Sequence, residues 1–119
     1  MAATLKGTGF DKAVGHKVTQ ALTIDSAAVL KNVTGGPGTL RSVLFDSAKS
    51  SASLYLHLFD GKDTSAAQIV FRGLAGSSRS LTFPDGWAFN ELSLWVSGAP
   101  GETDTTSFSG TVTAALVCS

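Results

Sequence analysis

The most regular alternation of hydrophobic and polar positions in the chain runs from Ser53 to Asp63. Its even and odd positions separate into three leucines on one face, Leu54, Leu56 and Leu58, and three ring-bearing residues on the other, Tyr55, His57 and Phe59. A period of two is typical of a β-strand, since successive side chains point to opposite sides of a sheet. We expect a strand in the middle of a sheet that packs its leucine face on a second sheet. Asp60-Gly61 should end it, because both residues favour turns.

Shorter alternating segments recur along the rest of the chain. They predict strands over residues 17–24, 27–33, 39–46, 67–72, 80–83, 87–97 and 107–118. No segment has the 3.6-residue period of an amphipathic helix, and turn-forming sequences separate the segments every eight to fifteen residues. This spacing is typical of sandwiches and jelly rolls. The sequence therefore predicts an all-β protein, a single jelly-roll-like antiparallel β-sandwich of about eight strands.

Large aromatic side chains raise a question about the predicted strand 87–97. A turn at Pro84-Asp85-Gly86 should precede this strand, which places Trp87, Phe89 and Trp95 together on the face opposite its aliphatic residues. So much aromatic area is seldom left in contact with water. Two explanations remain open: these side chains pack under a loop of the same chain, or they form a surface for another subunit or a ligand.

The chain's organisation is that of one domain with an N-terminal extension. A chain of 119 residues can support a single hydrophobic core. Residues 1–15 lack sustained periodicity and contain three glycines, so we expect an extended arm, followed by a β-sandwich domain over 16–119. Lys6, Lys12 and His16 make the arm and its junction mildly basic. It is either a solvated tail or an arm that docks on another subunit.

Charge and composition exclude several classes of protein. Nine basic residues balance nine acidic ones, so there is no overall field to attract nucleic acid or an anionic membrane. Only 15% of residues are charged, which suggests that neighbours cover part of the surface. No apolar run approaches the roughly 20 residues of a membrane span, and the first residues lack a signal-peptide pattern. We expect a soluble protein made in a reducing cytoplasm, with no nucleic-acid or membrane partner.

Residues that could carry out chemistry are few and lack the required contexts. His57 lies between two aromatic positions, so cross-strand packing is the expected role and general-base catalysis is not. There is no Gly-x-Ser-x-Gly sequence, and the glycines of 34–38 are not followed by Gly-Lys-Ser/Thr. Asp60 and Asp63 lack the ligand spacing of a calcium loop, and Glu102 and Asp104 should face water. Cys118 alone allows neither an intrachain disulfide nor a multi-cysteine metal site. We predict no enzymatic activity, cofactor or metal.

Four stretches, in this order, resemble a family of small virion proteins of tailed bacteriophages. These stretches read Tyr-Leu-His-Leu-Phe-Asp from Tyr55, Gly-Leu-Ala-Gly-Ser from Gly73, Leu-Thr-Phe-Pro-Asp-Gly-Trp-Ala-Phe from Leu81 and Gly-Glu-Thr-Asp-Thr-Thr from Gly101. The resemblance covers roughly residues 27–119 and rests on turns between strands, with no catalytic residue among them. Two features depart from the pattern: the arm before His16, and the Ser- and Arg-rich sequence 76–80.

The resemblance implies a capsid decoration or cement protein located on the virion, at the capsid surface. Such a protein would bind across subunits of the major capsid protein, self-associate as a homotrimer and stabilise the head. The residues that we expect to contact partners are Lys6, Phe10, Lys12, His16, Tyr55, Phe59, Trp87 and Trp95. Two alternatives remain: a tail adaptor or fibre component, and a carbohydrate-binding virion module that stacks a glycan on an exposed Trp87 or Trp95.

Overall fold

The computed structural model describes residues 3–6, 18–61 and 67–119, and the chain in these ranges is built of β-strands without a helix. The strands are β1 (Ala3–Lys6), β2 (Val18–Ile24), β3 (Gly38–Asp46), β4 (Leu54–Asp60), β5 (Ile69–Gly73), β6 (Ser78–Phe89), β7 (Leu92–Ser97) and β8 (Val112–Cys118). The all-β prediction is confirmed.

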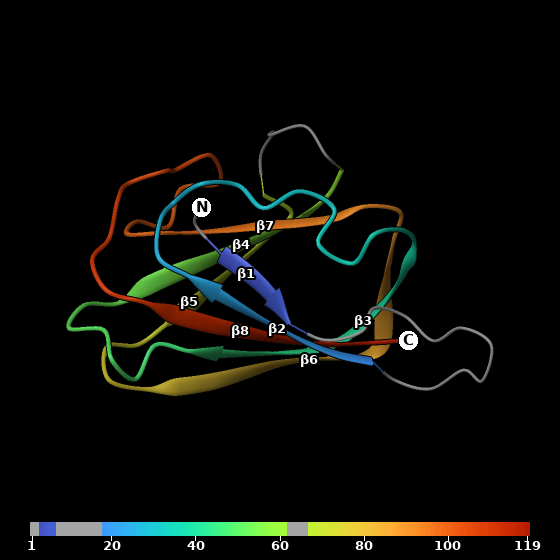
Figure 1. Ribbon diagram of the computed structural model, residues 1–119, viewed down its shortest axis with the longest axis horizontal. Helices are drawn as coiled ribbons and strands as arrows, with labels where there is room; N and C mark the ends of the chain where they lie inside the picture. The colour runs from blue at the N-terminus through green and yellow to red at the C-terminus, as the bar shows by residue number, and fades with distance from the viewer. Residues whose placement is uncertain (1–2, 7–17, 62–66) are drawn as a thin grey trace.

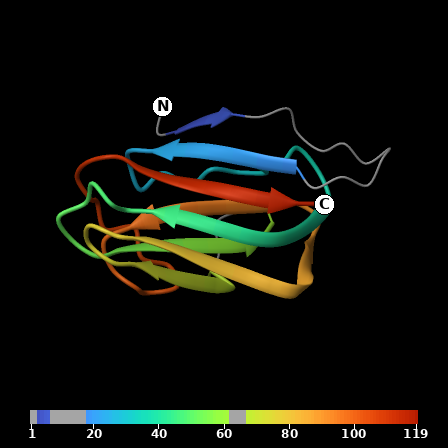
Figure 2. The same ribbon diagram turned by 90° about the horizontal axis from the view of Figure 1, so that it is seen from below.

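Two antiparallel sheets face each other across one core (Figure 1). The larger has the order β1-β2-β8-β3-β6, which Figure 2 shows side by side, and the smaller has the order β5-β4-β7. From β5 onward the chain changes sheet at every connection, so strands that are close in sequence lie in opposite layers. The predicted antiparallel sandwich is therefore present, and its strand order is that of a jelly roll.

The segment between β2 and β3 occupies the free edge of the smaller sheet without forming a strand. Leu30 exchanges two backbone hydrogen bonds with Leu94 of β7, at 2.8 and 3.0 Å, and the Val33 amide donates to the Leu92 carbonyl at 2.8 Å. The predicted strand 27–33 is thus corrected to an isolated bridge. Asn32 has a φ of 48°, a left-handed conformation that interrupts an extended run.

The core forms where the predicted leucine face of β4 meets the larger sheet. Leu54, Leu56 and Leu58 are at most 2% exposed and belong to one cluster with residues from both layers. β4 lies between β5 and β7, so the prediction of a central strand with a buried leucine face is confirmed. Cys118 is buried in the same cluster, where desolvation raises the pKa of its thiol to about 11.

The predicted turn at Pro84-Asp85-Gly86 lies inside β6. β3 pairs with β6 on both sides of it, Leu40 with Trp87 and Ser42 with Thr82, so residues 83–86 oppose a single residue of β3. Figure 2 shows the resulting sharp bend near the C-terminal end of β6. Gly86 has a φ of 77°, which accounts for its place in the bend. The chain does bend here, but no separate strand begins.

A change of sheet divides the predicted strand 87–97. β6 ends at Phe89 in the larger sheet, and β7 begins at Leu92 in the smaller one. Trp87 and Trp95, which the alternation placed on one face of one strand, therefore belong to different sheets. The last predicted strand is also shorter than expected, because β8 begins only at Val112.

Part of the predicted N-terminal arm is an edge strand. Residues 3–6 form β1, which pairs antiparallel with β2 in the register Ala3 to Ile24 and Lys6 to Ala21. An extended arm was expected here, and residues 3–6 of it pair at the edge of the larger sheet. The rest of the arm, 1–2 and 7–15, lies outside the described residues, as does the predicted start of the domain at 16.

Candidate functional site

The outer face of the smaller sheet carries a group of large ring-bearing side chains. Tyr55, His57 and Phe59 of β4 point away from the leucine core, and His57 is paired directly with Trp95 of β7. His57, Phe59 and Trp95 are each at most 1% exposed. A face that water would normally reach is therefore closed by other parts of the chain.

Trp95 is the centre of this buried outer face. Its ring stacks on His57 with centroids 4.4 Å apart and an angle of 1° between the planes, and Phe59 approaches at 5.6 Å and 68°. Its indole Nε1 donates a hydrogen bond of 2.7 Å to the carbonyl oxygen of Asp104, in the loop that follows β7. A buried tryptophan needs a partner for this N–H, and the loop supplies it. Of the two explanations left open for Trp95, packing under a loop is the one observed.

His57 and Ser97 form a buried polar pair beneath the same loop. His57 Nε2 and Ser97 Oγ are 2.8 Å apart, and Ser97 Oγ donates to the Ala99 carbonyl at 2.9 Å. Because the Ser97 hydroxyl proton is donated to the Ala99 carbonyl, we assign the imidazole proton to Nε2, which donates to Ser97 Oγ. Nδ1 is then an acceptor, buried without a hydrogen-bond partner. The basic nitrogen of His57, Nδ1, faces away from the Ser97 hydroxyl. This arrangement therefore does not activate Ser97 as a nucleophile.

Electrostatics around His57 favour its neutral form. Burial lowers the pKa of His57 below its ordinary value, while the Asp104 carboxylate and the Ala99 carbonyl act in the opposite direction. The pKa of Asp104 is also lowered, by hydrogen bonds from the Thr106 amide at 3.0 Å and hydroxyl at 2.8 Å. The predicted packing role of His57 is confirmed by its stacking on Trp95. Asp104, expected to face water only, also orders its loop.

Two further backbone hydrogen bonds close the loop after β7 at its base and attach its middle. The Gly98 amide donates to the Thr106 carbonyl at 2.9 Å, and the Ala67 amide donates to the Glu102 carbonyl at 2.8 Å. Together with the bond from Trp95 to Asp104, these contacts hold residues 98–106 against the smaller sheet. The acidic, Thr-rich sequence is thus a structural cover.

Asp60 stabilises the corner at which the chain changes sheet between β6 and β7. Its Oδ1 accepts hydrogen bonds from the amides of Asn90, at 2.9 Å, and Glu91, at 3.0 Å, and the Gly61 amide donates to the Glu91 carbonyl. An ionised acceptor makes such bonds stronger than neutral ones. The strand ends at Asp60 as predicted, and its carboxylate in addition orders the corner. Lys62 and Asp63 lie outside the described residues.

The predicted partner-contacting residues are distributed over very different environments. Phe59 and Trp95 are interior side chains, so we withdraw them from the set of surface contacts. Tyr55 and Trp87 are half-buried, and Trp87 packs beside Phe83 against the core. Lys6 lies in β1, but its side chain is not described, and Phe10, Lys12 and His16 lie outside the described residues. The aromatic set is not one surface.

The outer face of the larger sheet is a candidate surface that was not expected from the sequence. Strand register places three rows of side chains on it: Thr23, Thr113, Asp46 and Ser78; Ala21, Ala115, Leu44 and Ser80; and Val117, Ser42 and Thr82. Asp46 is the one charged residue in this set, and Leu44 is 44% exposed. We call these eleven positions the small-residue face. Its signal in the sequence is the use of Ser, Thr, Ala and Val where an outer strand face would ordinarily carry Lys or Glu.

Metal and membrane sites find no support in the residues described. Within 3–6, 18–61 and 67–119, no three His, Cys, Asp or Glu side chains gather in a way that could hold a metal ion. The same part of the chain contains no helix of the length and hydrophobicity needed to cross a membrane.

Comparisons with known proteins give little. No protein-family model and no curated protein sequence matches the chain. Among solved structures, a chain in the structure of infectious bursal disease virus, Gx strain, aligns with 98% of this chain at 18% identity and a TM-score of 0.23. This protein spans only 30% of that chain. At such a score the likeness carries no argument about fold or function.

Proposed function

We propose that this chain is a non-enzymatic structural protein of a bacteriophage particle, a decoration or cement protein that binds across major capsid protein subunits and stabilises the head. The observation that carries the proposal is the small-residue face of the larger sheet. Its eleven positions form one extended surface, and Asp46 is the one charged residue among them.

The low charge of that face, rather than its content of Ser and Ala, suits contact with another protein. The centres of protein interfaces are depleted of charged residues, so little desolvation energy is lost when they close. Short side chains also let a partner approach the pleated surface closely, and Leu44 stands out from it as the largest exposed apolar side chain. These properties favour a binding role over a catalytic one.

Three of the stretches that resemble the phage virion proteins lie where the chain turns, bends or crosses between the sheets. Asp60 holds the corner between β6 and β7, residues 83–86 form the bend of β6, and Asp104 holds the cover over Trp95. Joints of this kind specify how a sandwich is connected. The motifs therefore support a shared architecture, and the capsid function is carried over with it as part of the proposal.

The mechanism that we propose is multivalent binding. A homotrimer would present three small-residue faces to neighbouring capsid subunits, each making a modest contact. Once one face is bound, the others act at a high effective concentration, so the trimer resists removal even when each contact is weak. Reinforcement of the shell would follow from this bridging, with no reaction catalysed.

A tail adaptor or fibre component differs from this proposal chiefly in copy number. The decisive experiment is quantitative mass spectrometry of purified particles, with the major capsid protein as the internal standard. We expect copies in the hundreds per particle, as for a protein repeated over the shell. A dozen copies or fewer would reject the decoration role and favour the tail. The carbohydrate-binding alternative loses Trp95, which is 0% exposed, as a stacking platform.

A further inference from the structure

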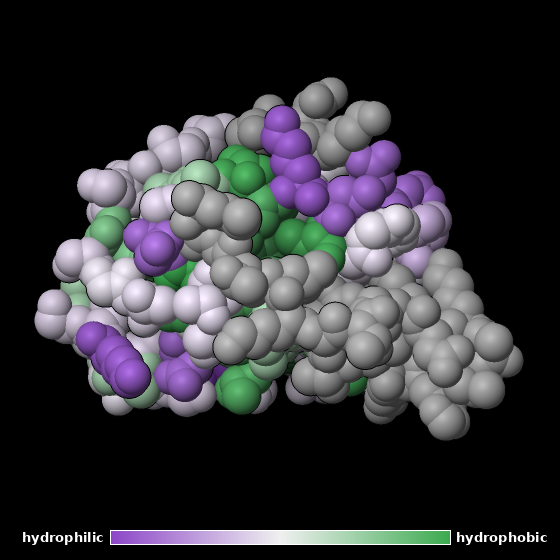
Figure 3. Space-filling model, viewed as in Figure 1, coloured by the Kyte–Doolittle hydropathy of each residue, from purple (hydrophilic) through white to green (hydrophobic). Residues whose placement is uncertain are grey.

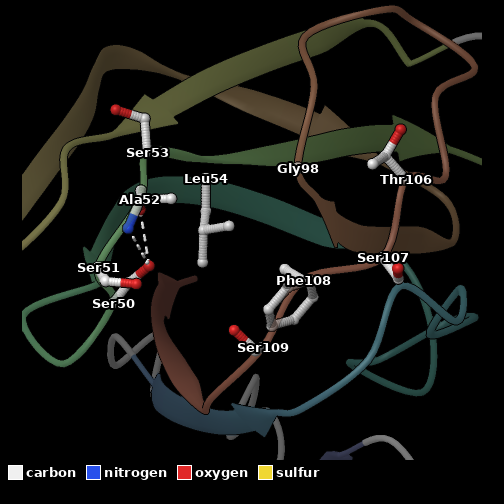
Figure 4. A pocket seen from close by; sticks show the side chains of 10 residues that line it. All are labelled: Ser50, Ser51, Ala52, Ser53, Leu54, Gly98, Thr106, Ser107, Phe108 and Ser109. Atoms are coloured by element: carbon white, nitrogen blue, oxygen red, sulfur yellow. Dashed lines mark hydrogen bonds between the residues drawn. The ribbon is translucent and has the colours of Figure 1, made fainter.

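A cleft at one end of the sandwich is not used by the proposed capsid contact. It has a volume of about 450 Å³ and lies between residues 50–54, which lead into β4, and Gly98 with residues 106–109, which lead into β8. Figure 4 shows Leu54 and the ring of Phe108 on facing sides of the hollow, with Ser109 at its rim. This volume is within the range of about 300–1,000 Å³ typical of small-molecule sites.

Most of the residues that line the cleft carry a hydroxyl group, and none of them is charged. Five serines and one threonine line the cleft. The Ser50 hydroxyl donates a hydrogen bond to the Ala52 carbonyl, and the Thr106 hydroxyl donates one to the Asp104 carboxylate. Those of Ser51, Ser107 and Ser109 make no hydrogen bond within the described ranges. Each of these three can both donate to and accept from a ligand.

An apolar floor complements the hydroxyls. Leu54 is 2% exposed, and Phe108 is half-buried against the core, so both are held by packing. The walls are fixed as well: the Gly98 amide bonds the Thr106 carbonyl at 2.9 Å, and the Gly76 amide bonds the Ser50 carbonyl at 3.0 Å. A Cβ at position 98 would lie 3.2 Å from the Ser107 carbonyl oxygen, so the close approach of this wall favours glycine. The cleft is largely preorganised, which lowers the entropic cost of binding.

These features together select one class of ligand. A phosphate or carboxylate calls for Arg or Lys, and a divalent cation calls for carboxylates, but neither kind of side chain lines the cleft. A neutral sugar matches it, because its ring has an apolar C–H face for Phe108 and a rim of hydroxyls for the serines. Figure 3 shows the end of the molecule with these loops as mostly pale surface, with isolated hydrophilic side chains. We propose that this cleft binds a neutral saccharide.

The test is an NMR titration of the ¹⁵N-labelled full chain, which requires neither capsid nor partner. The probes are methyl α-glucoside, methyl β-galactoside, N-acetylglucosamine, maltose, lactose and chitobiose, with glycerol as the control for a non-specific polyol effect. We expect saturable shifts of the amides of 50–54 and 106–109 with at least one sugar, at a dissociation constant in the millimolar range. The site is independent of the capsid proposal, so either can fail alone.

Two matched variants make the titration decisive. Ser109→Arg places a long charged side chain at the rim of the cleft and should weaken binding at least about ten-fold. Ser80→Arg makes the same change at an exposed serine of β6 and should leave binding unchanged. Both variants are checked for a native amide spectrum first.

Four results would overturn the saccharide site: no saturable shift with any sugar, equal shifts with glycerol, undiminished binding by Ser109→Arg, or equal loss of binding in Ser80→Arg. Shifts of the same amides with an uncharged tripeptide, where no sugar produces them, would identify the cleft as a peptide site and equally reject the proposal.

Discussion

The outer faces of the two sheets differ in how they are kept compatible with water. On the smaller sheet, large rings at His57, Phe59 and Trp95 are closed over by residues 98–106 of the same chain. On the larger sheet, the small-residue face carries short side chains, of which Asp46 alone is charged, and an exposed Leu44. One face is a second interior, and the other remains a surface.

The two faces show how hydrophobic residues on the second face of a strand are to be interpreted. Aromatic area is too costly to leave in water, so its presence predicts a cover, and here the chain provides one. Short uncharged side chains cost little in water and less to desolvate than charged ones, so such a face can stay exposed until a partner arrives. The conspicuous aromatic residues therefore mark internal architecture, and the inconspicuous face is the better candidate for recognition.

The largest effect that would break this comparison is expected at Trp95. Trp95→Ala removes a fully buried ring from between His57 and Phe59 and leaves the Asp104 carbonyl without its donor. We expect the free energy of unfolding to fall by about 3–5 kcal/mol, as for large-to-small substitutions in a core. Urea denaturation followed by circular dichroism measures it. Trp87→Ala, on the half-buried tryptophan of the larger sheet, is the matched control and should cost clearly less.

A smaller effect, through pH, sharpens the claim that the smaller sheet's outer face is an interior. The folded chain holds His57 neutral with a pKa below 6.5, whereas the unfolded chain takes up the proton at about 6.5. Below pH 6.5 the unfolded state therefore binds more protons, and the free energy of unfolding falls until the pH passes below the folded pKa. The lowered pKa of Asp104 acts separately, below pH 3.8.

Urea midpoints measured at pH 7.5, 6.5, 5.5 and 5.0 test this prediction. They should decrease as the pH falls through this window for the native chain. His57→Phe keeps a ring against Trp95 but cannot titrate, so its midpoints should decrease less over the same range. Equal slopes for the two proteins would show that another group is responsible.

The smallest effect on stability is expected on the larger sheet, at Leu44. Leu44→Lys adds a charge to the small-residue face and should change the free energy of unfolding by less than about 0.5 kcal/mol, because the side chain is 44% exposed. It should nevertheless abolish association with purified particles, measured by co-sedimentation. Leu74→Lys is the control, since Leu74 is 41% exposed and lies outside this face. Equal binding by both variants would remove the face from the capsid proposal.

The fold class and most of the strands follow from local patterns in the sequence. Alternation identifies which residues share a face, and this held for Leu54, Leu56 and Leu58 because side-chain direction in a strand is a local property. Turn chemistry likewise placed the end of β4 near Asp60 and the bend near Gly86. The packing role of His57 followed from its neighbours in the same strand.

The sheet that each strand joins and the cover over each face depend on tertiary contacts. Trp87 and Trp95 share a local pattern but lie in different layers, because the chain changes sheet between them. At this corner Asp60, distant in sequence, accepts hydrogen bonds from the amides of Asn90 and Glu91. Residues 27–33 alternate as a strand does, yet make only a bridge to β7. Pairing, closure by the 98–106 loop and the cleft beside Phe108 all depend on contacts between residues far apart in sequence. Local periodicity carries no information about such contacts, because it reports only the direction of each side chain relative to its neighbours.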